Sequence, residues 1–99
     1  MLKAKAEIQF TLEGREFVNK YIRPIFNFGE GLLFSGNIKS NQKVFKPQQR
    51  YAVDIDFFSI EDEAYDAVKP LLKDEMDLAI QEGAYRVIGI ANITNFVYE

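Results

Sequence analysis

The sequence predicts a mostly-β fold of about six antiparallel strands and one short helix, arranged as a small closed barrel or a sandwich. Three observations predict it. Residues 3–12 alternate between apolar and polar side chains, residues 76–97 form a hairpin pattern rich in β-branched residues, and only residues 59–73 have helical spacing. Alternation with a period of two is typical of a strand with one wet face, as in most antiparallel sheets.

The final hairpin is central to this prediction because it is too apolar to stand alone. In its first arm, apolar side chains from Met76 to Ile80 alternate with polar or small ones, and its second arm is crowded with β-branched residues. Gly83 is expected at the reversal, with a positive φ. Gly89 is expected to mark a bulge or a close approach of two backbones.

Four further strands precede the hairpin. Glycines within residues 13–14 and 29–31 punctuate turns, and Arg23-Pro24 prevents a helix from running through that segment. Residues 17–21 are expected to be irregular. Gly36 is expected to interrupt the strand that contains it. The four strands are expected at residues 3–12, 25–28, 32–38 and 51–57.

The passage SIEDEAYDAVKPLLK predicts one short inserted helix near residues 59–70. Ser59 is expected to cap its N-terminus, and Pro70 is expected to end or kink it. Acidic residues occupy the first turn, where the helix dipole favours them. Apolar residues recur at three- and four-residue spacing and predict an apolar stripe. The stripe comprises Ile60, Ala64, Ala67 and Val68, with Leu71 as a further candidate.

Composition indicates one small globular domain, residues 1–99, and removes several kinds of chemistry. Of its residues 47% are hydrophobic, which supports a packed core. The sequence has no His and no Cys, so the common general base, the thiolate nucleophile and Cys-based zinc sites are missing. No apolar run reaches the roughly 20 residues of a membrane helix, and the N-terminus lacks a signal-peptide core. We therefore expect a cytoplasmic protein that is not an enzyme and that uses no cofactor, metal or membrane.

The formal net charge of −3 hides a strong asymmetry along the chain. Residues 1–53 hold nine Lys/Arg and four Asp/Glu, a balance of +5. Residues 54–82 hold two Lys and ten Asp/Glu, a balance of −8. A polarised surface of this kind favours docking of a partner in one orientation.

Three stretches of the chain resemble one family of translation factors. The segment RPIFNF, residues 23–28, is similar to the RPxFxF strand in the C-terminal domain of bacterial elongation factor Tu. The segment DEMDLAIQEG, residues 74–83, resembles that domain's EEGLRFAIREG, and RVIGIA, residues 86–91, resembles its RTVGAG. The resemblance implies a single six-stranded antiparallel β-barrel, with the helix near residues 59–70 as an insertion that the factor lacks.

The resemblance also implies a function. In the full-length factor this domain carries no GTPase chemistry, helps to hold aminoacyl-tRNA and offers a surface to partner proteins. The leading hypothesis is therefore a stand-alone, non-catalytic binding module with a protein partner linked to translation. If that partner normally recognises the factor itself, the chain would act as a decoy or as an immunity-like protein.

Two local patterns suggest other chemistry, and each has a simpler interpretation. Residues 31–36, GLLFSG, have the glycine spacing of a P-loop, but Asn37 and Ile38 stand where Lys and Ser/Thr are needed. A buried strand is favoured there. Asp54 and Asp56 lie on one face of a predicted strand, where a hard-cation site is conceivable. Because no glycine-containing ligand loop accompanies them, a solvated strand face is favoured.

The basic segment, residues 39–50, is the second candidate site. It contains four cations and no acid, together with amides and the ring of Phe45, and Tyr51 follows it directly, a combination suited to RNA. RNA or tRNA binding is therefore the alternative hypothesis, and homodimerisation through an exposed patch is a third. In the leading hypothesis, this segment and the acidic helical passage orient a protein partner. The candidate partner-binding residues are Lys39, Lys43, Lys46, Arg50, Arg86, Glu61, Asp62, Glu63 and Asp66.

Overall fold

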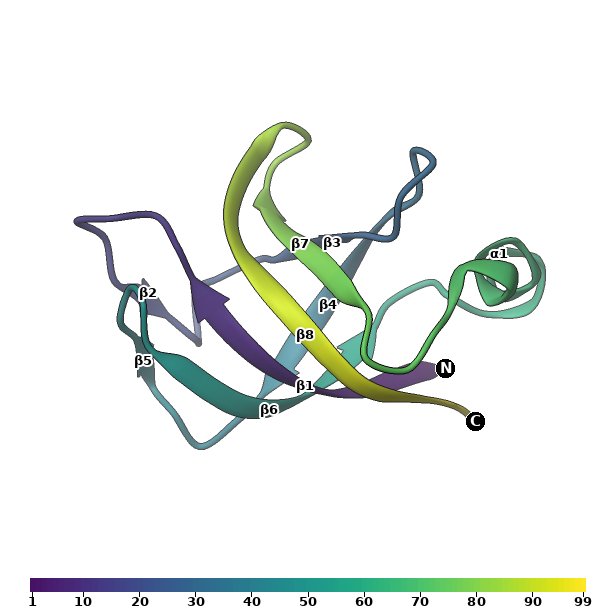
Figure 1. The fold of residues 1–99 in the computed structure, drawn as a ribbon, viewed down its shortest axis with the longest axis horizontal. Coiled ribbons are helices and arrows are strands. Elements are labelled where there is room, and N and C mark those ends of the chain that lie inside the picture. Colours follow the sequence, from purple (N-terminus) through teal and green to yellow (C-terminus); the bar gives the residue numbers. More distant parts are fainter.

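The strands of the computed structural model, which describes residues 1–99, close into a six-stranded antiparallel β-barrel (Figure 1). Around the barrel the strands follow the order β1-β6-β4-β3-β7-β8, and β8 pairs with β1. The predicted fold class is therefore confirmed. The elements are β1 (Leu2–Phe10), β2 (Phe17–Val18), β3 (Ile25–Asn27), β4 (Leu33–Lys39), β5 (Val44–Phe45), β6 (Arg50–Phe57), α1 (Asp62–Val68), the 3₁₀ helix η1 (Lys69–Leu71), β7 (Asp77–Glu82) and β8 (Arg86–Tyr98).

The C-terminal hairpin closes the barrel because β8 pairs with both of its neighbours. This strand has 13 residues and lies antiparallel to β7 on one side and to β1 on the other. Ile88 is an extra residue in the pairing with β7, and Thr94 is an extra residue in the pairing with β1. Such bulges bend and twist a strand, as a small barrel requires. Gly83 has a φ of 68° at the reversal, as predicted.

Two glycines allow the barrel wall to pack closely. A Cβ atom at position 89 would lie 2.6 Å from the backbone oxygen of Gln9, so the predicted close approach at Gly89 is confirmed. A Cβ atom at position 36 would lie 2.6 Å from the ring of Phe26. The prediction that Gly36 interrupts its strand is wrong, because β4 continues through it and the missing side chain makes room for that ring.

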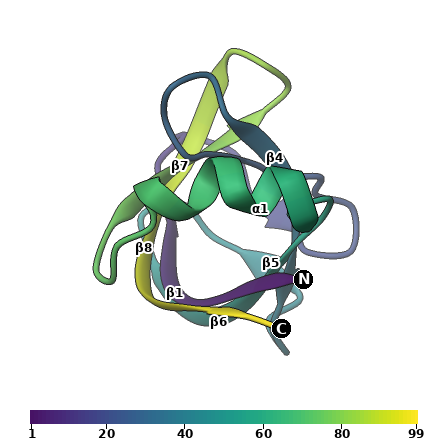
Figure 2. The ribbon, with the colours of Figure 1, turned by 90° about the vertical axis from the view of Figure 1, so that its right-hand side faces the viewer.

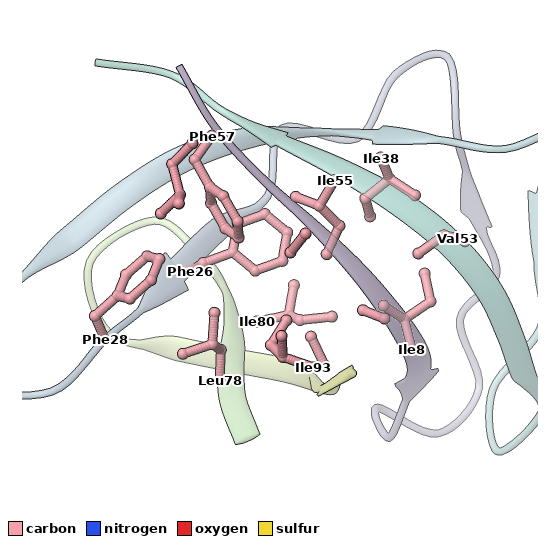
Figure 3. Close-up of a cluster of buried hydrophobic side chains, with 14 of the residues drawn as sticks. Ile8, Phe26, Phe28, Ile38, Val53, Ile55, Phe57, Leu78, Ile80 and Ile93 are labelled. Carbon is pink, nitrogen blue, oxygen red and sulfur yellow. The ribbon is translucent and has the colours of Figure 1, made fainter. Parts of the chain in front are cut away.

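Apolar side chains from all six barrel strands fill the interior (Figure 3). Alternate residues of each strand point inward, and Ile8 of β1, Ile55 of β6 and Ile80 of β7 are fully buried. Phe26 packs edge-to-face on Phe57, with the ring centroids 5.2 Å apart. The removal of these apolar groups from water is the main force that stabilises the barrel.

A short helical segment covers one end of the barrel (Figure 2). The inserted helix is confirmed, but α1 begins at Asp62 and continues into η1, which contains Pro70. The prediction that Ser59 caps the helix is wrong, because Glu61 occupies that position and makes no side-chain cap. Instead, the Asp62 N–H donates a hydrogen bond to the hydroxyl oxygen of Tyr98 at 3.1 Å. Neither helix is long and apolar enough to span a membrane.

The helical segment is held to the barrel by a narrow line of contacts. Ile60 and Val68 are fully buried, and the ring of Tyr65 stacks on that of Tyr98 with centroids 3.6 Å apart. The predicted stripe is wrong at Ala67, which is exposed. Successive helical residues point about 100° apart, so Ala67 turns away when Val68 faces the barrel.

A small two-stranded sheet lies at the opposite end, where β2 pairs with β5. Phe17 of β2 is opposite Phe45 of β5, and its ring stacks on that of Phe10 with centroids 4.6 Å apart. The prediction that residues 17–21 are irregular is wrong for Phe17 and Val18. A strand of two residues is too short to show a period in the sequence, and tertiary pairing forms it.

Candidate functional site

The charge asymmetry of the sequence becomes a separation along the long axis of the molecule. The extents are 38 × 26 × 22 Å, and β2 and β5 lie at one end of the longest axis with α1 at the other (Figure 1). Residues 11–24 and 39–50, which we call the basic end, hold seven Lys/Arg and two Asp/Glu, a net charge of +5 within these ranges. Three of the seven cations pair with carboxylates from other parts of the chain, Glu7, Asp56 and Glu82. Residues 58–77, which we call the acidic end, hold two Lys and seven Asp/Glu, a net charge of −5.

A tight turn at residues 40–42 forms a ridge between two grooves at the basic end. The Gln42 N–H donates to Ser40 Oγ at 3.0 Å, and the Asn19 side-chain amide donates to the Gln42 backbone oxygen at 3.2 Å. These bonds hold the ridge against the segment that follows β2. The cations of the first groove, about 940 Å³, are Lys5, Lys39 and Arg50. The cations of the second groove, about 730 Å³, are Lys20, Arg23 and Lys43.

The predicted residues of the first groove are partly neutralised. Lys39 Nζ lies 2.9 Å from Asp56 Oδ2, and Arg50 Nη1 lies 3.3 Å from Glu7 Oε1. The hydrogen bond to Asp56, reinforced by its negative charge, raises the pKa of Lys39. Both basic side chains are exposed, so these pairs contribute little to stability and leave donors for a ligand.

The second groove has unpaired cations. Lys20, Arg23 and Lys43 form no ion pair with a carboxylate. The Lys20 ammonium lies 5.4 Å from the ring centre of the exposed Tyr21. Of these three cations, only Lys43 is predicted from the sequence, because Lys20 and Arg23 come to lie beside it only when β2 pairs with β5. In the sequence, the run from Lys20 to Arg23, in which two cations flank the ring of Tyr21, is the pattern that could have indicated these two residues.

Two further basic candidates lie outside both grooves. Lys46 follows β5, and its backbone N–H donates to the Tyr51 hydroxyl oxygen at 2.9 Å. Arg86 begins β8, opposite Glu82 of β7, so the fold does not bring it to the basic segment. The Glu82 carboxylate accepts two hydrogen bonds from Arg15, at 2.8 and 2.6 Å, which lower the pKa of Glu82.

The four acidic candidates lie together at the start of the helical segment. Glu61 Oε1 is 3.6 Å from the amino group of Met1. Asp62 is fixed through its backbone bond to the Tyr98 hydroxyl. Glu63 and Asp66 are exposed on α1 and form no ion pair. The acidic end therefore presents carboxylates directly to the surroundings.

The other two sequence patterns form ordinary parts of the barrel wall. Asp54 and Asp56 point outward from β6, and Asp54 lies opposite Lys5 on one neighbouring strand and Lys39 on the other. The last residues of the P-loop-like segment belong to β4, so their amides take part in a sheet. No three His, Cys, Asp or Glu side chains are grouped so that they could hold a metal ion.

Both ends of the molecule expose charged and polar side chains. Cations and amides line the basic end and carboxylates line the acidic end, so each end favours a surface of opposite charge. No protein-family model and no curated protein matches the chain.

Proposed function

We propose that the protein is a non-catalytic binding module, resembling the C-terminal domain of elongation factor Tu, that docks a protein partner. The observation that carries the proposal is the separation of net charges of +5 and −5 along an axis of 38 Å. Opposite charges at two ends steer an approaching partner, fix its orientation and disfavour partners with another charge pattern.

The barrel architecture supports the resemblance to the translation factor. The segment RPIFNF supplies β3, and the two other matching segments supply β7 and β8, which pair as a hairpin. We therefore propose a partner linked to translation, and one that recognises the factor itself is the sharpest form of this proposal. In that form the chain is a decoy or an immunity-like protein.

Capture of partners from the native lysate by the tagged protein tests the proposal. The lysate is divided into a nuclease-treated and an untreated half, and we expect the same protein to be retained from both. Charge removal at the acidic end should then release it. The test variant carries Glu61→Gln, Asp62→Asn, Glu63→Gln and Asp66→Asn, which keep side-chain size, and Asn tolerates the φ of 51° at position 62.

A matched control separates the acidic end from general loss of charge. Glu13→Gln with Glu16→Gln removes two exposed carboxylates at the basic end, which becomes more positive, and should not weaken capture. A complex that survives the acidic-end variant would refute the role of that end. If no protein is retained in either half, the docking proposal is wrong.

A second candidate function is binding of single-stranded RNA at the basic end. The second groove favours RNA binding, because it is lined by three unpaired cations and several amides. The exposed ring of Tyr21 lies beside Lys20 of this groove. Cations follow a phosphate backbone, and an aromatic ring stacks on a base whatever its identity.

Titration of fluorescent single-stranded RNA at several salt concentrations tests this candidate. Lys20→Glu with Lys43→Glu should weaken binding to all sequences and flatten the salt dependence, since each lost phosphate contact removes about 0.7 from the logarithmic slope for single strands. Lys69→Glu with Lys73→Glu, at the acidic end, is the control and should have a smaller effect. Equal effects of both pairs would contradict a site at the basic end.

A further inference from the structure

Eight outward-pointing positions on four neighbouring strands carry no charged side chain, and all of them except the buried Gln81 are at least partly exposed. The strand register arranges them in two rows across the barrel. One row runs through Ser35, Ile25, Gln81 and Val87, and the other runs through Leu33, Asn27, Ala79 and Ile90. We call this surface the uncharged face.

Large apolar side chains of the uncharged face remain in contact with water. Val87 is 52% exposed, Ile90 is 40% exposed and Leu33 is 38% exposed. At the adjoining tip of the β7–β8 hairpin, Tyr85 is 96% exposed and contributes a large ring to the same region. In an antiparallel sheet with one wet face, outward positions are usually polar, so an apolar cluster of this kind indicates a contact surface.

The two amide side chains of this face, Asn27 and Gln81, already have partners within the molecule. The Asn27 amide donates to Gln81 Oε1 at 3.0 Å, and the Gln81 amide donates to the Ala84 backbone oxygen at 2.8 Å. Asn27 Oδ1 accepts a hydrogen bond from the Gly29 N–H at 2.8 Å. Covering the face would therefore cost few hydrogen bonds to water, and this removes the usual penalty for burying amides.

We propose that the uncharged face binds the same face of a second copy of this chain. A two-fold axis in the contact plane can run along the long axis of the molecule or across it. The first arrangement places like ends side by side. The second places the basic end of each copy beside the acidic end of the other, with net charges of +5 and −5. Charge complementarity thus selects an antiparallel pair.

The arrangement also matches the usual anatomy of a protein interface. The strands of the uncharged face lie between β2 and β5 at the basic end and α1 at the acidic end (Figure 1). An apolar centre would then be bordered by charged rims that set its orientation. This inference goes beyond the proposed function, because it concerns the purified chain without any other partner.

Sedimentation equilibrium of the purified protein, from about 1 μM to about 1 mM, measures the pairing directly. We expect the mass to rise with concentration from 11.4 kDa to twice that value. Because the ends attract in the antiparallel pair, added salt should weaken the dimer. Lys43→Glu with Lys46→Glu reduces the net charge of the basic end from +5 to +1 and should weaken it as well.

Matched substitutions on β8 locate the interface. Val87→Glu with Ile90→Glu should weaken the dimer at least about tenfold, because both place a carboxylate in the apolar centre. Val97→Glu is the control: Val97 is 46% exposed on the same strand but faces outward beside Lys3, and the dimer should persist. Ile90→Thr should also weaken the dimer. Because Thr is well tolerated in strands, this variant tests the interface even if the double Glu variant does not fold.

Three results would overturn the inference. A mass of 11.4 kDa at every concentration would exclude the dimer. Equal effects of the Val87/Ile90 and Val97 substitutions would exclude this face. A dimer that salt strengthens would exclude the antiparallel arrangement. None of these results depends on the capture experiment, so the docking proposal and this inference can fail separately.

Discussion

The two halves of the barrel wall differ in what they present outward and agree in what they present inward. On one half, Asp54 of β6 lies between Lys5 of β1 and Lys39 of β4, so that charges of opposite sign alternate across three strands. We call this half the charged face. On the other half, the eight outward positions of the uncharged face carry no charge.

The interior is continuous beneath both faces. Ile55 lies under the charged face and Ile80 under the uncharged face, and both are fully buried in one apolar cluster (Figure 3). Inward positions therefore account for folding on both halves. The two faces therefore share one apolar core, and they differ in the side chains that they offer for contact.

The largest expected effects come from the shared interior. Ile55→Ala and Ile80→Ala should each lower the free energy of unfolding by about 2–5 kcal/mol, since each removes buried methyl groups and leaves a cavity. Urea denaturation measures both values. Similar losses would support a continuous core, whereas a loss near zero at either position would show that one half of the barrel does not depend on it.

The next effect concerns the seam where β8 meets β1. Gly89→Ala should lower the free energy of unfolding by about 1–3 kcal/mol, because the new methyl group would meet the backbone of Gln9 and the strands must separate. Thr94→Ala, at an exposed position of the same strand, should change it by less than about 0.5 kcal/mol. Equal effects would contradict the close approach.

A smaller effect is expected within the uncharged face itself. Gln81→Leu leaves the Asn27 amide without its acceptor and the Ala84 oxygen without its donor. The free energy of unfolding should fall by about 1–2 kcal/mol. Ser35→Ala removes a polar group of the same face that makes no side-chain hydrogen bond and should be nearly neutral. A neutral Gln81→Leu would mean that the amide network is dispensable.

The smallest effect should come from an exposed ion pair. Because Arg15 lowers the pKa of folded Glu82, the pair stabilises the protein above the ordinary carboxyl pKa of about 4.3 and loses this contribution as pH falls through the lowered value. Glu82→Gln should therefore be slightly less stable than the wild type at neutral pH and equal to it in acid. Thermal unfolding over a pH series checks this, and a difference that does not vary with pH would contradict it.

Much of the fold follows from alternation in the sequence. The inward side chains of β1 and β6 could be identified in advance, because long strands with one wet face show a clear period. Neither β2 nor β5 could be predicted in this way, because two residues show no period. Their pairing depends on the contact between Phe17 and Phe45. Ser59 met the rule for a helix cap, but the chain enters α1 at Glu61, where Tyr98 supplies the first hydrogen bond.

The candidate surfaces are harder to predict from the sequence than the strands, because they depend on the register in which the strands pair. The charged segments were visible in the sequence, but the groove that joins Lys43 to Lys20 and Arg23 exists only because β2 pairs with β5. The uncharged face draws two residues from each of four strands, and no single stretch reveals it. The alternation in the sequence predicts that Gln81 is an exposed polar residue. In the fold it is buried, and its side-chain amide donates to the Ala84 oxygen at the hairpin tip.

The most direct test of docking through charged ends is the affinity of the captured partner for three purified baits at low and high salt. The baits are the wild type, a basic-end variant with Lys43→Gln and Lys46→Gln, and an acidic-end variant with Glu63→Gln and Asp66→Asn. We predict that both variants bind more weakly than the wild type and lose part of its salt dependence. Equal affinities of all three baits at both salt concentrations would contradict the proposed function.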